Sequence, residues 1–236
     1  VLAMCNASAS YLHRKPDAVI YHGVKTDVYI PPENKETAWQ ALNLFPQSVN
    51  KGKYGIAILG RVREQKGVHL FVRSCIKLLD KYPDYTAVVV GSISSSNESF
   101  VQTLQAEIEK AGLAERIVFA GEQNFADIPK IFSALSLVVA LSDNEGFGLT
   151  ILEAMSSEAA VLASEAGAWP EVVRAGEDGY VVPVNDLPAV VDKMDLLLSD
   201  HKQLAQMGIN GRKRVLEHYS VQREAQQLVD FFRSLM

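Results

Sequence analysis

Two short stretches of this sequence carry groups that could bind an anion. The first, GRVREQKG at residues 60–67, places Arg61, Arg63 and Lys66 close together in a chain of net charge −5. Guanidinium and ammonium groups donate charge-assisted hydrogen bonds to phosphate, each worth about 1.5–3 kcal/mol. The stretch has neither the Gly-Lys-Ser/Thr order of a P-loop nor the GxGxxG order of a dinucleotide site. It predicts phosphate binding of another kind, with a solvated charged loop as the alternative interpretation.

The second stretch, EGFGLTILEAM at residues 145–155, places two acids on either side of a turn. Glu145 precedes the turn, and Glu153 falls within about one helical turn after it. Carboxylates accept hydrogen bonds from hydroxyl groups. Two of them beside an anion site suggest a ligand with hydroxyls on both sides of a phosphate. The alternative is a capped helix with ordinary surface acids.

The turn between these acids would bind the anion through backbone amides. Gly146 and Gly148 are expected to adopt unusual dihedral angles and to let the backbone approach a ligand closely. The free N–H groups of Leu149 and Thr150 would then face the anion at the start of a helix. The helix dipole and these hydrogen bonds together would contribute on the order of 1–2 kcal/mol.

The elements that would position these stretches alternate along the chain. Short apolar or β-branched runs predict strands at residues 18–21, 55–59, 86–90, 116–119, 136–141, 160–163 and 180–183. Helical patterns predict helices at residues 68–82, 99–112, 126–135, 149–157, 170–174, 186–199, 201–218 and 220–235. Several strand segments are apolar throughout, as in parallel strands buried on both faces. The alternation predicts an α/β fold with a doubly wound, Rossmann-like parallel sheet.

In such a sheet, ligands bind at the carboxyl ends of the strands. The loops expected to form the site are therefore residues 60–67, 91–99, 120–126, 142–150 and 164–170. Both anion-binding stretches are among these loops.

Composition and charge argue against several classes of protein. With 48% hydrophobic and 22% charged residues, the chain has an ordinary globular composition. A net charge of −5 argues against nucleic acid as a partner. Cys5 and Cys75 have no metal-ligand spacing, which favours a reducing cytoplasm. No apolar run approaches the length that a membrane span needs.

The motifs resemble, in order and spacing, the C-terminal half of retaining glycosyltransferases of family 4, which have the GT-B fold. The resemblance covers roughly residues 18–218 and includes VIYHGVKTDVYIPP at 19–32 and SEAGAWPEVVRAGEDGYVVPVND at 164–186. In detail the chain looks most like bacterial lipopolysaccharide-core mannosyltransferases. The resemblance implies a hexosyltransferase domain that binds a GDP- or UDP-linked sugar. Mannose is the first guess, and a glycan or lipopolysaccharide core would be the acceptor.

The resemblance also implies a role for each matching residue. The expected catalytic residues are Arg61 and Lys66, which would bind the donor diphosphate, and Glu145, which would hold hydroxyls of the transferred sugar. Further donor contacts are expected from Gly60, Gly146, Phe147, Gly148, Leu149, Thr150 and Glu153, the last through ribose hydroxyls. The nucleobase region is expected at Gly91, Glu122, Gln123, Asn124 and Phe125, and the base itself is left open.

The sequence departs from the family pattern at three places. His22 stands where asparagine is frequent. Ala168 and Trp169 stand where a second glycine is common, which predicts a reshaped loop on the sugar side. The loop after Gly91 lacks a second glycine and is longer and serine-rich, so its donor contacts are expected to differ from the family pattern.

The resemblance divides the chain into three parts. Residues 1–17 would be the tail of a missing N-terminal domain, residues 18–218 the nucleotide-sugar-binding domain, and residues 219–236 a helix that packs back on the missing domain. In this fragment the helix would expose Leu228, Phe231 and Phe232 or pair with another copy. Because a glycan or lipid-linked acceptor would bind through the missing domain, the fragment is expected to bind donor and to transfer little sugar.

Other expectations concern metal, membrane and alternative functions. The chain has no Asp-x-Asp pair, which predicts metal-independent chemistry and no cofactor. GRKRV at residues 211–215 is expected to be a solvated helix face, with a membrane-surface role as the alternative. The expected location is the cytoplasm, or the periphery of the inner membrane for the full-length enzyme. A nucleotide-sugar 2-epimerase and a non-catalytic binding module are the alternative functions.

Overall fold

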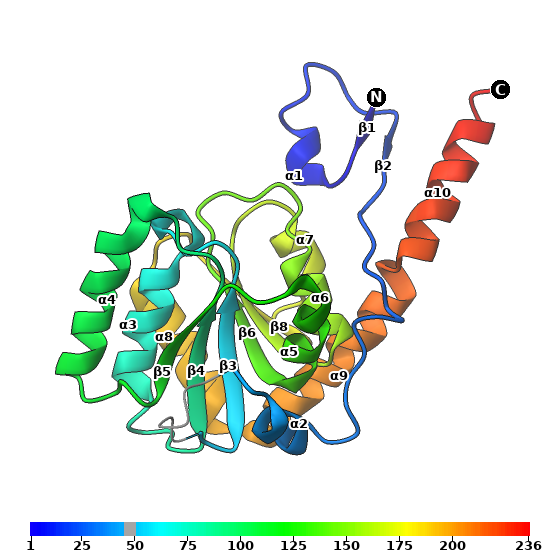
Figure 1. The fold of residues 1–236 in the computed structure, drawn as a ribbon. Coiled ribbons are helices and arrows are strands. Elements are labelled where there is room, and N and C mark those ends of the chain that lie inside the picture. Colours follow the sequence, from blue (N-terminus) through cyan, green and yellow to red (C-terminus); the bar gives the residue numbers. More distant parts are fainter. Residues whose placement is uncertain (45–50) are drawn as a thin grey trace.

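The computed structural model describes residues 1–44 and 51–236 and contains the predicted parallel sheet (Figure 1). Six strands lie in the order β5-β4-β3-β6-β7-β8, and every neighbouring pair is parallel. Their bounds are Tyr54–Leu59 (β3), Tyr85–Val90 (β4), Ile117–Gly121 (β5), Leu135–Ala140 (β6), Ala160–Ser164 (β7) and Gly179–Val182 (β8). The predictions of an α/β fold and of these six strands are confirmed.

Both faces of the sheet are buried, as the apolar strand segments predicted. In β3, Ile56 and Ile58 pack in one hydrophobic cluster, and Ala57 between them packs in the other. Each of the three side chains is 3% exposed or less. Successive residues of a strand point to opposite faces, so helices must cover the sheet on both sides.

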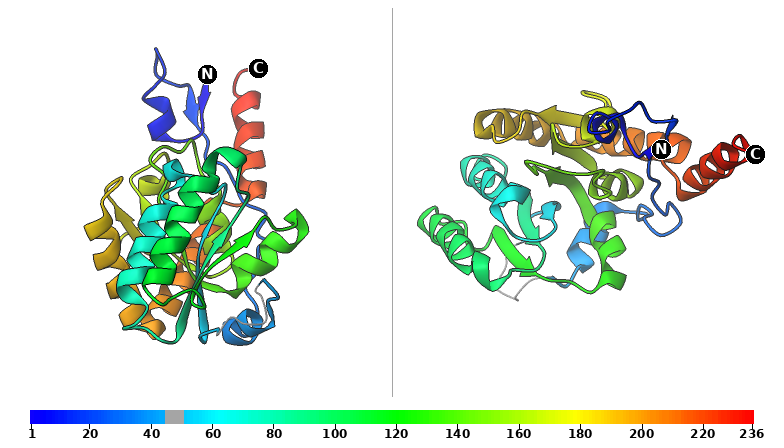
Figure 2. Two further views of the ribbon diagram at one scale, coloured as in Figure 1. Left: turned by 60° about the vertical axis from the view of Figure 1, so that its left-hand side comes forward. Right: turned by 90° about the horizontal axis from the view of Figure 1, so that it is seen from above.

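Helices cover the two faces in separate layers (Figures 1 and 2). The face of Ile56 is covered by α3 (Val68–Leu78), α4 (Glu98–Lys110) and α8 (Leu187–Ser199). The face of Ala57 is covered by α2 (Lys35–Ala41), α5 (Ile128–Ala134), α6 (Thr150–Ser156) and α7 (Trp169–Val172). Helix α9 (His201–His218) contributes to both clusters. Short 3-10 turns are η1 (Glu64–Lys66), η2 (Ser95–Asn97) and η3 (Phe125–Asp127).

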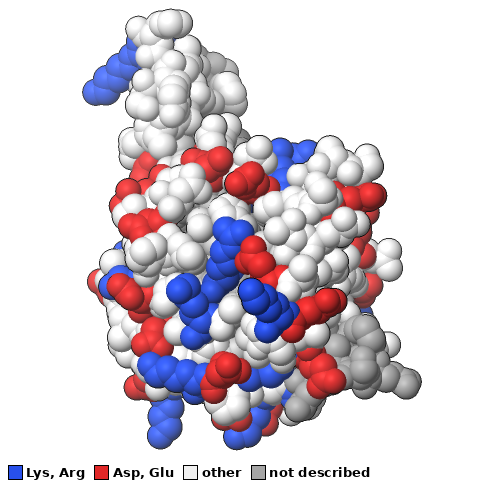
Figure 3. All heavy atoms as spheres, turned by 90° about the vertical axis from the view of Figure 1, so that its left-hand side faces the viewer, with Lys and Arg blue, Asp and Glu red and all other residues white. Residues whose placement is uncertain are grey.

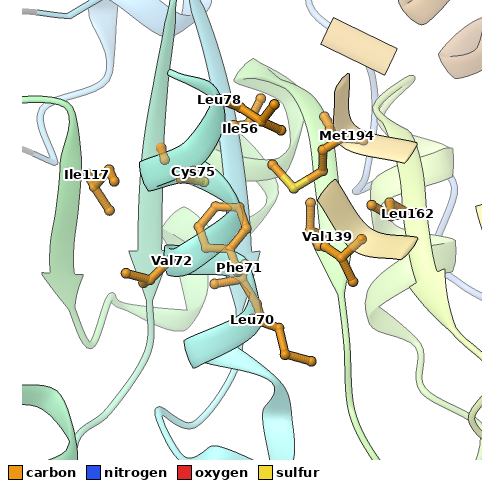
Figure 4. Close-up of a cluster of buried hydrophobic side chains, with 14 of the residues drawn as sticks. Ile56, Leu70, Phe71, Val72, Cys75, Leu78, Ile117, Val139, Leu162 and Met194 are labelled. Carbon is orange, nitrogen blue, oxygen red and sulfur yellow. The ribbon is translucent and has the colours of Figure 1, made fainter. Parts of the chain in front are cut away.

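The first of these clusters shows how the helices are fixed on the sheet. Phe71 and Leu70 of α3 belong to one cluster with Ile56 and Val139 of the sheet and Met194 of α8 (Figure 4). Phe71 is fully buried. Burial of a side chain of this size contributes about 1.5–3 kcal/mol, so packing at α3 holds the start of this helix, and the loop before it, in place.

The N-terminal segment lies outside the main sheet. The predicted strand at 18–21 is reduced to β2 (Ala18–Val19), which pairs in parallel with β1 (Leu2–Ala3) and not with the six-stranded sheet. A short helix, α1 (Asn6–Ala9), follows β1. Figure 1 shows this segment above the carboxyl ends of the strands. Its hydrophobic pattern is strand-like, but the pattern does not specify which sheet a strand joins.

The last helix, α10 (Val221–Arg233), extends away from the sheet beside the β2 segment (Figures 1 and 2). None of its residues is buried, and Phe232 is 57% exposed, as predicted, while Phe231 is half-buried. The start of the helix is attached to the chain after β2, because Val24 exchanges backbone hydrogen bonds with Tyr219 and Val221.

The GRKRV stretch does not form the fully solvated face that its charge predicted. In α9, Arg212 donates to the backbone carbonyls of Tyr29 and Ser156, and Arg214 donates to the carbonyl of Val172. Both arginines therefore fix α9 to distant backbone segments. Sequence charge alone does not distinguish an arginine in water from one that satisfies carbonyls at helix ends.

Charges of both signs are mixed on the face formed by α3, α4 and α8 (Figure 3). Arg73 of α3 pairs with Glu107 of α4 at 2.8 Å, and Lys81 pairs with Asp195 of α8 at 2.8 Å. This face therefore presents no continuous basic surface. Across residues 1–44 and 51–236, no helix combines the length and the apolar character that a membrane crossing requires.

Helix α2, which the sequence patterns missed, is fixed by its first residue. The ammonium group of Lys35 donates to the carbonyls of Ser133 (2.9 Å) and Ser157 (2.7 Å), at the ends of α5 and α6. The carbonyls of a helix's last turn lack partners within the helix, so this lysine satisfies two of them. Burial lowers the pKa of Lys35 to about 7, against the smaller opposing effect of Glu158.

We expect the stability contributed by Lys35 to depend on pH. Between pH 7 and about 10.5 the unfolded chain binds a proton at this lysine that the folded chain has released, so the free energy of unfolding rises with pH. The difference in free energy of unfolding between the wild type and Lys35→Met should therefore change in favour of the wild type by roughly 1 kcal/mol for each pH unit. Urea unfolding at pH 7.5 and 9.5 measures this shift. Lys53→Met, at an exposed lysine, is the control, and a gap for Lys35→Met that stays constant with pH would contradict the prediction.

Candidate functional site

The two anion-binding stretches meet where β3 and β6 lie side by side. These strands are neighbours in the sheet although β4 and β5 separate them in the chain. Ligands bind at such a point, because the connections leave it in opposite directions. The loop after β3 packs on the end of β6 at Gly67, where a Cβ would lie 2.4 Å from the Leu141 carbonyl oxygen. The amide of Asp143 donates to the carbonyl of Gln65 at 3.0 Å, which joins the two loops.

Lys66 and Glu145, predicted to serve the same ligand, form an ion pair. Lys66 Nζ lies 2.6 Å from Glu145 Oε2, and Ser142 Oγ donates to the same oxygen at 3.2 Å. The side chains of Lys66 and Glu145 are 24% and 21% exposed, so water screens the pair only in part. The structure brings both loops' charged groups into one place.

The turn between Glu145 and α6 depends on one of its two glycines. Gly148 has φ of 77°, and its carbonyl accepts a hydrogen bond from Trp169 Nε1 at 3.1 Å. A Cβ on Gly148 would lie 2.3 Å from that nitrogen and 2.7 Å from Glu145 Cγ. Gly146 lies outside the left-handed region, and a Cβ there would meet open space. The expectation of unusual dihedral angles is therefore correct for Gly148 and wrong for Gly146.

A pocket of about 420 Å³ opens beside this turn. Of the expected site residues, it is lined by Gly60, Arg61, Gly91, Glu122, Gln123, Phe125, Thr150 and Glu153. Ser92, in the expected loop 91–99, also lines it. The sequence patterns missed the remaining lining residues, which are Tyr29, Leu59, Val90, Ile128 and Phe132. Arg61, in the loop after β3, and Thr150, at the start of α6, therefore line one cavity, and Gly91 and Glu122 add the loops after β4 and β5.

Other expected residues lie beside the pocket and not in its wall. These are Lys66, Asn124, Glu145, Gly146, Phe147, Gly148 and Leu149. Phe147 is buried and makes edge contacts with Tyr21 (6.3 Å) and His22 (5.2 Å). Leu149 is the N-cap residue of α6 and is 41% exposed. Its side chain has no hydrogen-bond acceptor, so the first amides of α6 remain available to water or to a ligand.

Glu153 lies in an environment that differs from that of Glu145. Its Oε1 accepts a hydrogen bond from the hydroxyl of Tyr29 at 2.8 Å. Burial raises the pKa of Glu153, and the hydrogen bond from Tyr29 lowers it by a smaller amount. Tyr29 comes from the segment between β2 and α2. Local sequence patterns did not predict its contact with Glu153, which lies 124 positions away.

Trp169 and Glu171, in the stretch 164–186, contact the turn beside the site and the N-terminal segment, respectively. Trp169 is buried and bonds to the Gly148 turn. Glu171 accepts from the hydroxyl of Tyr21 at 2.6 Å and from the amides of Asn6 (3.0 Å) and Ala7 (2.9 Å). Burial alone would raise the pKa of Glu171, but these hydrogen bonds outweigh it and lower the pKa. The N-terminal segment is thereby attached to α7.

Metal binding was not expected at this site. Within residues 1–44 and 51–236, no group of three or more His, Cys, Asp or Glu side chains is arranged to hold a metal ion. Whether the chemistry needs a metal stays a prediction.

The fold and the site define a class of protein. A six-stranded parallel sheet flanked by helices, with its pocket at the carboxyl ends of the strands, is the architecture of the C-terminal domain of GT-B glycosyltransferases. Residues 40–214 match the family described as "Glycosyl transferases group 1", and the chain belongs to that family.

Two relatives are similar over the whole chain. The lipopolysaccharide core biosynthesis mannosyltransferase LpsB of Rhizobium meliloti is 39% identical over 238 residues, covering 100% of this chain and 66% of LpsB. The lipopolysaccharide core biosynthesis mannosyltransferase LpcC of Rhizobium leguminosarum bv. viciae is 39% identical over 236 residues, covering 100% of this chain and 64% of LpcC. The chain thus spans a little less than two thirds of each relative.

Solved structures agree with this assignment. The C-terminal domain of the glycosyl transferase group 1 family protein LpcC from Francisella tularensis is 40% identical, with a TM-score of 0.78, covering 84% of this chain and 100% of that domain. Alr3699/HepE of Anabaena, solved in complex with UDP, shares the fold with a TM-score of 0.85 at 24% identity, covering 99% of this chain and 63% of HepE.

We expect the two glycines of the turn to respond differently to a methyl group. Gly148→Ala should lower the free energy of unfolding by about 2–4 kcal/mol, because the turn holds this residue at positive φ, which alanine disfavours, and the new Cβ collides with Trp169 and Glu145. Gly146→Ala, two residues earlier, is the matched control and should change it by less than about 0.5 kcal/mol. Urea unfolding of both variants tests the prediction, and equal losses would show that the turn is not held as described.

Proposed function

We propose that this chain is the nucleotide-sugar-binding domain of a retaining, metal-independent glycosyltransferase. The observation that carries the proposal is the convergence of Arg61, Thr150 and Glu153 on one pocket, with the Lys66–Glu145 pair beside it. The pocket offers a cation and helix amides for a diphosphate, and an acceptor for ribose hydroxyls. A nucleotide-sugar carries a diphosphate and ribose hydroxyls along its length, so one such molecule would engage all of these protein groups.

The residues order the donor across the site. The diphosphate lies between Arg61, Lys66 and the first amides of α6, and the ribose lies at Glu153. The base extends towards Gly91 and the residues 122–125, where Phe125 is 86% exposed and free to stack on a ring. The transferred sugar lies at Glu145, on the outer side of the turn.

Transfer breaks the bond between the sugar's C1 and the phosphate oxygen and forms a bond from C1 to an acceptor hydroxyl oxygen, whose proton is released. Negative charge develops on the departing nucleoside diphosphate. Arg61, Lys66 and the amides at the start of α6 face that charge, and preorganised donors of this kind lower the barrier most effectively where water is excluded. These groups supply electrostatic stabilisation without a metal.

Relatives support the choice of substrates for the whole protein. Two mannosyltransferases of lipopolysaccharide core biosynthesis are 39% identical to the chain, which supports mannose as the sugar and a lipopolysaccharide core as the acceptor. The UDP complex of HepE supports a nucleotide ligand for this fold. The acceptor, glycan or lipid-linked, would bind with the help of an N-terminal domain. The buried free thiols of Cys5 and Cys75 fit a reducing cytoplasm, with the inner-membrane periphery as the place of action.

The diphosphate contacts predict how variants bind. Lys66→Ala and Arg61→Ala should each weaken binding of the preferred nucleoside diphosphate about 10- to 100-fold, because each removes a charge-assisted hydrogen bond. Calorimetric titration of the chain with GDP, UDP and ADP identifies the base first and then measures each variant.

Lys110→Ala, at an exposed lysine at the end of α4, is the control for loss of a positive charge and should bind like the wild type. Thermal unfolding of each variant checks that the fold is kept. Undiminished affinity in both Lys66→Ala and Arg61→Ala would show that the diphosphate does not bind at these residues. Absence of binding by the wild type would reject the proposed function.

A further inference from the structure

We propose that Tyr29 is a positioning residue that holds the Glu153 carboxylate for the two ribose hydroxyls and so makes the site selective for ribonucleotides. The inference rests on the proposed function, which places the ribose at Glu153, and adds to it a residue that positions this carboxylate. Its basis is the hydrogen bond from the Tyr29 hydroxyl to Glu153 Oε1, at 2.8 Å, in the wall of the pocket.

Tyr29 is held in place independently of Glu153. Its side chain and backbone together are only 7% exposed, and its ring makes an edge contact with Phe132 at 5.6 Å. Its carbonyl accepts from Ser156 Oγ at 2.6 Å and from Arg212 Nη1 at 3.1 Å. Backbone and ring are therefore fixed, and the hydroxyl has one hydrogen-bond acceptor among the described residues, Glu153 Oε1.

The carboxylate of Glu153 is left with unused acceptor capacity. Among the described residues, Tyr29 is the one hydrogen-bond donor to either of its oxygens. An ionised carboxylate has roughly four acceptor positions, and a buried one is costly unless they are filled. The second oxygen, Oε2, is free for a ligand in a pocket that Glu153 lines. A vicinal diol supplies two donors at the spacing of one carboxylate, and ribose carries such a diol.

Tyr29 also keeps the carboxylate in its accepting form. Burial raises the pKa of Glu153 and the hydrogen bond from Tyr29 opposes that rise. The other charged groups in the wall of the pocket are Arg61, from the loop after β3, and Glu122, from the end of β5. Without the phenol, Glu153 would take up a proton at a higher pH and lose an acceptor. Preference for a diol should then disappear at a higher pH than in the wild type.

The test compares nucleotides that differ only in one hydroxyl. The chain is titrated by calorimetry with GDP, 2′-deoxy-GDP and 3′-deoxy-GDP, and with the corresponding uridine compounds, from pH 8 down to pH 5. The ratio of dissociation constants between the deoxy and the ribo form is the readout, because protonation of the phosphates cancels in it. We expect a wild-type ratio of about tenfold or more for hydrogen bonds to a charged acceptor.

Tyr29→Phe keeps the ring against Phe132 and removes only the hydroxyl. It should reduce the ratio to less than about threefold at pH 7, approaching that of Glu153→Gln, and its remaining preference should vanish at a higher pH than in the wild type. Tyr82→Phe is the matched control: the Tyr82 hydroxyl donates to Asp195 Oδ1 at 2.7 Å, away from the pocket, and its loss should leave the ratio unchanged.

The outcomes separate this inference from the proposed function. If the wild type binds ribonucleotides selectively and Tyr29→Phe keeps both the ratio and its pH dependence, Tyr29 has a packing role only and the inference is overturned. If the wild type binds the ribo and deoxy forms equally, Glu153 does not read the diol and the inference is overturned while nucleotide binding stands. If the wild type binds none of the nucleotides, the proposed function fails and the inference fails with it.

Discussion

Burial of both faces of the parallel sheet is the constraint on which the rest of this structure depends. Because helices occupy both sides of strands such as β3, polar groups cannot reach a ligand from the body of the sheet. They must come from the loops at the strand ends, and the pocket described above opens where the connections after β3 and β6 leave the sheet in opposite directions. Arg61 and Glu153, 92 positions apart in sequence, share one cavity for this reason.

Much of this arrangement follows from sequence because it is local. The strands around the switch point are continuous apolar runs, and the four charged residues stand at fixed distances from them. The topology therefore places Arg61 and Glu153 in one pocket and pairs Lys66 with Glu145. Local patterns also predicted a left-handed glycine in the turn, although the sequence does not say that Gly148 alone needs it. The difference arises from Trp169, whose indole occupies the space beside Gly148 and leaves Gly146 open.

The parts that sequence patterns missed are those made by contacts over long distances. Tyr29 belongs to a segment without regular structure, and its partner in the pocket is 124 positions away. Arg212 is part of a charged run that looks solvated, yet it bonds to the carbonyl of Tyr29. The short strand β2 is apolar like the others, but pairs with β1. In each case the residue type is compatible with several surroundings, and only the packed chain selects one.

The two glutamates that bracket the turn are held by different chemistry. Glu145 is paired with an ammonium group at 2.6 Å, whereas Glu153 accepts from a neutral phenol at 2.8 Å. In the proposed complex a diphosphate would compete with Glu145 for Lys66, and as Lys66 turns to the phosphates Glu145 gains acceptor capacity for sugar hydroxyls. The phenol cannot be drawn away in this manner, because it carries no charge for a phosphate to attract. In the proposed complex the same motif would therefore provide one acid whose partner changes when the ligand binds, at the transferred sugar, and one whose partner stays, at the ribose.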